Sequence, residues 1–126
     1  MSHKQMIILR KDLNMRKGKM VAQGAHASMS VFLQCMEKNG DNLVFRMDER
    51  SEPWLTGRFK KICVSVNSEE ELLGLYQKAK DAGVLCSLIQ DAGLTEFGGI
   101  PTYTAIAIGP DTNEKIERLT GHLPLL

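Results

Sequence analysis

Short apolar runs alternate with amphipathic stretches along this chain, which is typical of strands and helices in turn. Apolar runs predict four β-strands, at residues 6–9, 61–66, 84–89 and 102–108. Apolar residues at helical spacing predict three helices, from about 19 to 38, from 69 to 82 and a short one ending near 121. The predicted order is strand, helix, irregular segment, strand, helix, strand, strand, helix.

Local signals set the ends of these elements. Ser68 and Glu71 form a capping box that opens the second helix, and Asp111 and Glu114 are expected to do the same for the last. We expect the proline at 110 to end the fourth strand. Because periodicity fades over residues 41–58, we expect an exposed connection there, with Trp54 in it.

Strand–helix–strand alternation implies parallel neighbours, whereas the short link before the fourth strand permits an antiparallel pair. The sequence therefore predicts an α/β protein with a three-layer fold, in which a four-stranded mixed β-sheet is flanked by helices. A length of 126 residues fits a single domain over residues 1–126.

Composition excludes several classes of protein. The chain is 43% hydrophobic and 25% charged, which argues against disorder, and its apolar runs are too short for a membrane span. The residues after Met1 show no signal-peptide pattern. The three cysteines form no C-x-x-C pair, so we expect a cytoplasmic protein with reduced, mostly buried thiols and no membrane association.

Charge is concentrated near the N-terminus. Residues 1–20 hold six Lys or Arg and one Asp, giving +5 within a chain of net charge +1. Such a cluster suits phosphate groups, although a solvated basic surface is the simpler interpretation of the charge alone.

Two groups of polar residues are candidates for a site. Lys19, Gln23 and His26 share a narrow stripe of the first helix, opposite its apolar arc, beside a helix N-terminus that favours anions. Asp91 and Thr95 follow the third strand, where ligand sites of α/β folds lie. If the first and third strands are parallel, both groups share one sheet edge. The alternatives are an exposed polar helix face and a turn-capping Asp91.

Other chemistries find no support. The chain lacks a G-x-S-x-G nucleophile motif, a phosphate-binding glycine loop and paired histidines at metal-ligand spacing. Cys63 and Cys86 lie in apolar strands and are expected to be core thiols rather than nucleophiles.

Several motifs together resemble one known family. Residues 18–27 (GKMVAQGAHA) and 87–95 (SLIQDAGLT) are similar to two signatures of the type II peptidyl-tRNA hydrolases, and residues 104–110 and 120–123 also match. The resemblance implies hydrolysis of the ester that joins a peptide to tRNA. It implies peptidyl-tRNA as the partner, a homodimer, and neither a metal nor another cofactor.

The resemblance also implies roles for individual residues. The catalytic candidates are Lys19, His26, Asp91 and Thr95, and the substrate-binding candidates are Arg16, Lys17 and Gln23. Lys19 suits oxyanion or phosphate binding, and Thr95 and Gln23 suit orienting hydrogen bonds. Two ways of activating the attacking water remain possible: His26 acts as the general base, or Asp91 holds the water.

Two other functions stay open. One is a non-catalytic RNA- or protein-binding module on the same fold, and the other is a hydrolase of a different acyl ester.

Overall fold

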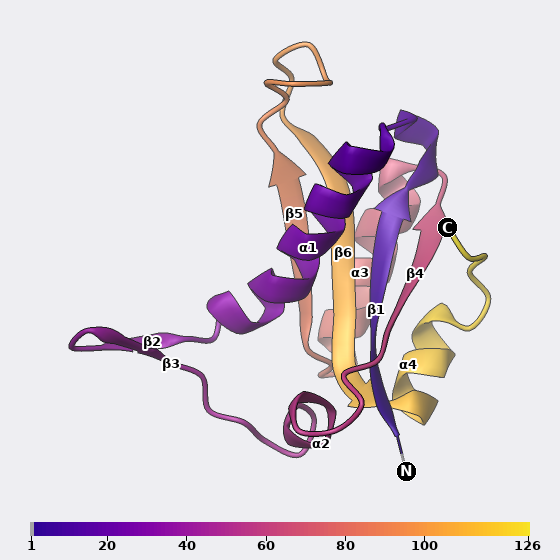
Figure 1. Ribbon diagram of the computed structural model, residues 1–126. Helices are drawn as coiled ribbons and strands as arrows, with labels where there is room; N and C mark the ends of the chain where they lie inside the picture. Colours follow the sequence, from indigo (N-terminus) through magenta and orange to yellow (C-terminus); the bar gives the residue numbers. More distant parts are fainter. Residues whose placement is uncertain (1) are drawn as a thin grey trace.

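The computed structural model describes residues 2–126 (Figure 1). The main sheet contains β1 (His3–Arg10), β4 (Lys61–Val66), β5 (Cys86–Asp91) and β6 (Thr102–Thr112), and a small hairpin contains β2 (Glu37–Asn39) and β3 (Asn42–Val44). The helices are α1 (Lys17–Leu33), α2 (Glu52–Leu55), α3 (Glu69–Asp81) and α4 (Asn113–Thr120). None of the helices within residues 2–126 combines the length and the apolar character needed to cross a membrane.

The main sheet is mixed and has the strand order β4-β1-β6-β5. β1 pairs in parallel with β4, and β6 runs antiparallel to both β1 and β5. β1, β4 and β5 therefore point the same way, and their carboxyl ends lie at one edge of the sheet (Figure 1).

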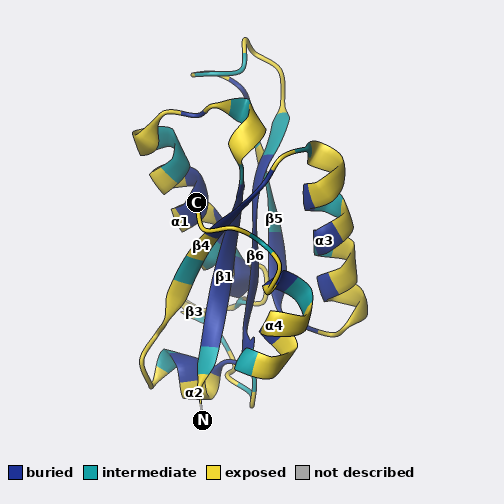
Figure 2. Ribbon diagram, turned by 90° about the vertical axis from the view of Figure 1, so that its right-hand side faces the viewer, coloured by how far each residue is buried: buried dark blue, intermediate teal, exposed yellow. Residues whose placement is uncertain are grey.

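Helices cover both faces of this sheet. Figure 2 shows α1 on one side and α3 with α4 on the other. Successive residues of β1 alternate between the two cores, since Ile8 packs with α3 and α4 and Leu9 packs with α1. The predicted three-layer α/β fold with a four-stranded mixed sheet is thus confirmed.

The segment after α1 differs from the expectation. The helix predicted to reach residue 38 ends at Leu33, and β2 and β3 form an antiparallel hairpin instead. Asn39 pairs with Asn42, so the turn is Gly40-Asp41, and Gly40 at φ +61 has a left-handed conformation that glycine adopts readily. The hairpin turn, rather than the apolar spacing, therefore decides the structure here.

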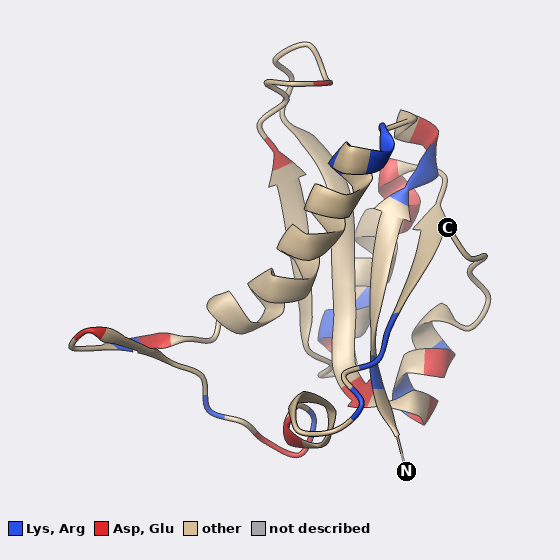
Figure 3. Ribbon diagram, viewed as in Figure 1, with Lys and Arg blue, Asp and Glu red and all other residues tan. Residues whose placement is uncertain are grey.

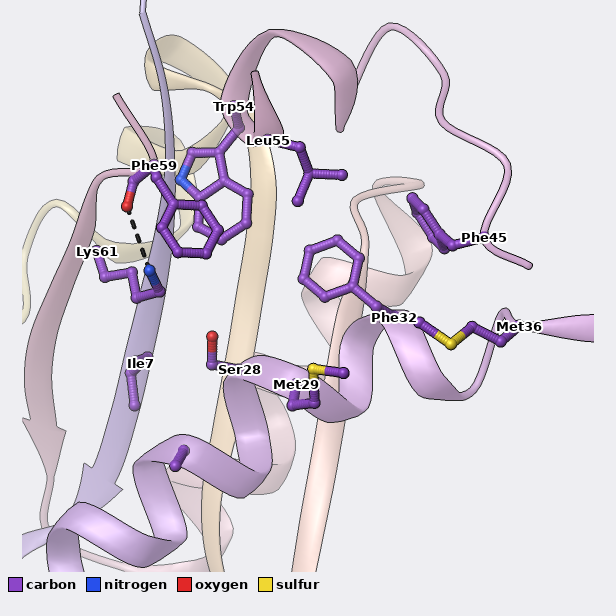
Figure 4. A pocket seen from close by; sticks show the side chains of 11 residues that line it. Ile7, Ser28, Met29, Phe32, Met36, Phe45, Trp54, Leu55, Phe59 and Lys61 are labelled. Atoms are coloured by element: carbon purple, nitrogen blue, oxygen red, sulfur yellow. Dashed lines mark hydrogen bonds between the residues drawn. The ribbon is translucent and has the colours of Figure 1, made fainter. Parts of the chain in front are cut away.

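The segment 41–58, expected to be an exposed connection, is partly buried around Trp54. Its side chain is 1% exposed, and its ring stacks on Phe32 with centroids 5.8 Å apart. The indole N–H donates to the carbonyl of Lys60 at 2.7 Å. Figure 4 shows this aromatic cluster beside α1, with Phe59 next to Trp54. The short helix α2 thus adds to the core on the α1 side.

The fourth strand also continues past the expected break. β6 extends to Thr112 because its last residues pair with β1, in the registers Lys4–Asp111 and His3–Thr112. Asp111 is consequently a buried strand residue and not a helix cap. The cap of α4 is Thr112, whose hydroxyl accepts a hydrogen bond from the Lys115 N–H.

The cysteines are free thiols, but only one of them is buried. Burial raises the pKa of Cys86. Cys63 is exposed because β4 is an outer strand, and Cys35 is exposed beyond the end of α1. The expectation of mostly buried thiols is therefore wrong for two of the three.

Candidate functional site

The loops that follow β1 and β5 meet at one edge of the main sheet. β1 leads through a 3-10 turn (Lys11–Leu13) to the start of α1, which carries Lys19. β5 ends at Asp91. Because both strands are antiparallel to β6, the topology brings together the two groups of polar residues that the sequence suggested.

Lys19, Asp91 and Thr95 form a hydrogen-bonded cluster at this edge. The Lys19 Nζ donates to Asp91 Oδ1 at 2.8 Å and to Thr95 Oγ1 at 2.9 Å. The side chains of Lys19 and Asp91 are 14% and 15% exposed, so their ion pair is partly shielded from water. A charge-assisted bond in such surroundings is stronger than one on an open surface.

Asp91 is held as a carboxylate. The ammonium of Lys19 is the main cause that lowers the pKa of Asp91 below its ordinary value, and the backbone N–H of Gly93 adds to it. That N–H donates to Asp91 Oδ2 at 2.8 Å. Asp91 therefore caps its own turn and also anchors Lys19, so the turn-capping interpretation is confirmed, and the proposed catalytic role stays a prediction.

Gly93 makes the turn after Asp91 possible. Its φ is +82, and an added Cβ would lie 2.2 Å from the carbonyl oxygen of Ile100. A side chain does not fit there, so glycine at this position fixes the loop that carries Thr95.

Gln23 lies beneath the cluster rather than on an outer stripe. Gln23 is 3% exposed, whereas the apolar Val21 on the same helix is 72% exposed. Thr104 of β6 donates its hydroxyl proton to Gln23 Oε1, and Gln23 Nε2 lies 3.5 Å from Asp91 Oδ1. The helix is thus turned so that part of the predicted polar stripe faces the sheet, where Thr104 satisfies the buried amide.

His26 lies one turn further along α1 and is exposed. It lines a hollow of about 730 Å³ together with Gln23 and Asp91. A positive charge on His26 also contributes, after Lys19 and Gly93, to the lowered pKa of Asp91. The imidazole is therefore near the carboxylate while remaining open to water.

The basic residues of the N-terminal segment do not form one patch. Lys4 is buried at the opposite end of β1, where it pairs with Glu117, and Arg10 pairs with Asp12. Lys11, Arg16 and Lys17 remain exposed. Figure 3 shows basic positions around the start of α1.

Arg16 and Lys17 stand at the N-terminus of α1. Arg16 is the N-cap residue, with no side-chain cap, and its own side chain is 86% exposed with Nε 3.4 Å from Glu96 Oε1. Uncapped N–H groups at a helix start favour anions. This end of α1 therefore offers a setting for phosphate groups.

Comparisons with known proteins show the family of this chain. A family model described as Peptidyl-tRNA hydrolase PTH2 matches residues 3–126. The chain belongs to the peptidyl-tRNA hydrolase PTH2 family. A peptidyl-tRNA hydrolase of Methanocaldococcus jannaschii is 46% identical over 98% of this chain and 99% of its own length. Those of Methanothermobacter thermautotrophicus and Methanopyrus kandleri are 43% and 41% identical, each over 98% of this chain and 99% and 98% of their own lengths.

In this peptidyl-tRNA hydrolase family member, two further residues contact the candidate site and were missed in the sequence. Thr104 bonds Gln23, and the ring of Phe97 lies 5.7 Å from the Lys19 Nζ. Thr104 carries a signal, since it is a polar residue at the start of an apolar strand. Phe97 carries none beyond its place in the glycine-rich loop.

The described residues offer no ligand set for a metal. Within residues 2–126, no group of three His, Cys, Asp or Glu side chains is arranged to hold an ion.

Proposed function

We propose that this protein hydrolyses peptidyl-tRNA, cleaving the ester between the carboxyl end of the peptide and the terminal ribose. The Lys19–Asp91–Thr95 cluster supports this most directly. An ammonium has three N–H groups, and two of those of Lys19 bond Asp91 and Thr95. The third is available to donate to the ester carbonyl oxygen.

Lys19 is proposed to stabilise the charge that develops during hydrolysis. Attack of water on the ester carbonyl carbon produces a tetrahedral oxyanion, to which a preorganised donor is worth far more than to the neutral carbonyl. Asp91 and Thr95 fix the ammonium beforehand, so little reorganisation is required during the reaction. Gln23 supports Asp91 from below.

His26 is proposed as the general base. It takes a proton from the attacking water, and the ester C–O bond then breaks as the ribose oxygen receives that proton. The peptide leaves as a carboxylic acid that ionises, and tRNA leaves with its hydroxyl group restored. The lowered pKa of Asp91 makes that carboxylate a weak base, which favours His26 over a water activated by Asp91.

Arg16 and Lys17 are proposed to bind tRNA phosphates. Replacing both by alanine is expected to weaken tRNA binding and to lower the slope of log Kd against log salt concentration by about 1–2. The slope falls because fewer counterions are released on binding when a phosphate contact is lost. Titration of labelled tRNA at several salt concentrations measures this slope. The control replaces Lys78 and Lys80, which are exposed on α3 across the sheet. Equal slopes for the two double variants would remove Arg16 and Lys17 from the tRNA contact.

Turnover separates this proposal from the two other functions. Purified protein is expected to release peptide and tRNA repeatedly from peptidyl-tRNA, and to act far more slowly on a simple peptide ester without tRNA. Binding without turnover would show a non-catalytic module, and equal turnover of both substrates would show a general acyl esterase. We expect the rate to persist with a chelator, since metal-ligand spacing is absent from the sequence.

We further propose that the protein acts as a cytoplasmic homodimer. An apolar hollow of about 520 Å³ beside α1 supports a second copy as the partner (Figure 4). Met29 and Phe59 line it and are 50% and 47% exposed. Such exposed apolar area is typical of an interface. Light scattering should give twice the 14.0 kDa chain mass, and a single-chain mass would contradict the dimer.

A further inference from the structure

The hollow of about 730 Å³ between α1 and β5 adjoins the Lys19–Asp91–Thr95 cluster. We call it the α1–β5 groove. His26 and Asp91 lie in its lining and connect it to the proposed chemistry. Its other walls are largely apolar, with Met29 and Leu33 on α1 and Leu88 and Ile89 on β5.

The two sides of Lys19 differ in the number of basic residues. None of the described residues that line the α1–β5 groove is Lys or Arg. The exposed basic residues Arg16 and Lys17 lie at the start of α1, whereas the groove follows the helix toward its end at Leu33. A polyanion is thus favoured on one side and an uncharged chain on the other.

The strand that forms one wall of the groove has a free edge. β5 is the outermost strand of the main sheet and pairs with β6 on its other side. The carbonyl of Cys86 faces away from β6, because it accepts a hydrogen bond from the Gln34 side chain at 2.6 Å. Since backbone groups alternate in direction along a strand, those of Leu88 face the same open edge.

We propose that the α1–β5 groove binds the peptide part of the substrate as an extended strand along β5. This inference rests on the proposed function, which places the ester at Lys19 and Asp91. The carboxyl end of the peptide then lies at the carboxyl end of β5, so the bound peptide runs parallel to that strand. Because Gln34 occupies the carbonyl of Cys86, the part of β5 open to a peptide is Ser87–Asp91, which is about 17 Å long at roughly 3.3 Å per residue and accommodates about five peptide residues.

Backbone pairing and apolar contact have different consequences for the substrate. Backbone hydrogen bonds along a free edge are independent of sequence, which suits an enzyme that meets many peptides. Contact with Leu33 and its neighbours favours apolar side chains. Because these interactions are the same before and during the reaction, they lower KM and leave kcat unchanged.

The test compares two substrates with the same tRNA, one carrying a single acetylated alanine and one an acetylated apolar pentapeptide. For the unmodified protein we expect KM to be about tenfold lower for the pentapeptide, with similar kcat. A factor of ten corresponds to about 1.4 kcal/mol, within reach of one buried apolar side chain.

Leu33→Glu should bring the ratio of the two KM values close to one. Leu33 is 49% exposed, so this variant is expected to fold, and Ser30→Trp provides a second change that fills the groove. The matched control is Val21→Glu, which changes an apolar residue of α1 that is 72% exposed and outside the groove, and should retain the ratio.

The outcomes separate this inference from the proposed function. Hydrolysis of both substrates with equal KM by the unmodified protein would overturn the peptide assignment and leave the proposed function standing. An equal loss on both substrates in Leu33→Glu and Ser30→Trp would also overturn the assignment. Failure to hydrolyse either substrate would overturn both proposals.

Discussion

Replacing Lys19 by alanine is expected to lower the rate constant of peptidyl-tRNA hydrolysis by about 100-fold or more. Loss of one preorganised donor to an oxyanion has effects of this size. Lys19 is held 2.8 Å from Asp91 and 2.9 Å from Thr95, so its position does not depend on the substrate. The effect should fall on the chemical step, whereas tRNA affinity should change little because Arg16 and Lys17 remain.

Asp91→Ala should cost a similar factor, because it frees Lys19 from its anchor. Since the two residues act as a unit, the double variant should be little slower than the poorer single variant. Thr95→Ala is expected to be milder, because its hydroxyl mainly orients the ammonium. If the rate of the double variant were lower by the product of the two single factors, Lys19 and Asp91 would have independent roles.

His26→Ala is expected to lower the rate by about 100-fold or more and to change its pH dependence. The carboxylate of Asp91 has a lowered pKa, so it stays ionised from pH 5 to 8 and adds no titration there. A general base acts only in its deprotonated form, so a residue of the site that fills this role is expected to make the rate rise with pH. Single-turnover rates between pH 5 and 8 should show this profile in the unmodified protein and lose it in the variant.

A matched control is His122→Ala. His122 is exposed beyond α4 and lies outside the α1–β5 groove, so its removal should leave both the rate and the pH profile unchanged. If His26→Ala retains nearly full activity, His26 is not the base, and Asp91 is the residue that holds and activates the attacking water. Circular dichroism of each variant verifies that the protein is folded.

The convergence of Lys19 with Asp91 could be predicted from the sequence because it depends on topology. Strand–helix alternation fixes the direction of β1 and β5, and parallel strands end at the same edge of a sheet. The cap of α3 was equally readable, since the N–H of Glu71 donates to the Ser68 hydroxyl as the capping box predicts, whereas the box expected at Asp111 did not form.

Features that depend on tertiary partners could not be predicted. Gln23 looks like a surface residue in sequence, and only Thr104, 81 positions away, makes its burial favourable. The pairing of β6 with β1 carries the strand through the proline at 110. Likewise, nothing local indicates that Lys4 is buried with Glu117, and this removes one charge from the expected basic cluster.

The most direct measurement is single-turnover hydrolysis of one peptidyl-tRNA by saturating amounts of the unmodified protein, Lys19→Ala and Lys38→Ala. Lys38 is an exposed lysine on β2 and serves as the matched control. The account predicts a rate constant at least about 100-fold lower for Lys19→Ala, with tRNA binding retained, and an unchanged rate constant for Lys38→Ala. A Lys19→Ala rate close to that of the unmodified protein would contradict the proposed active site.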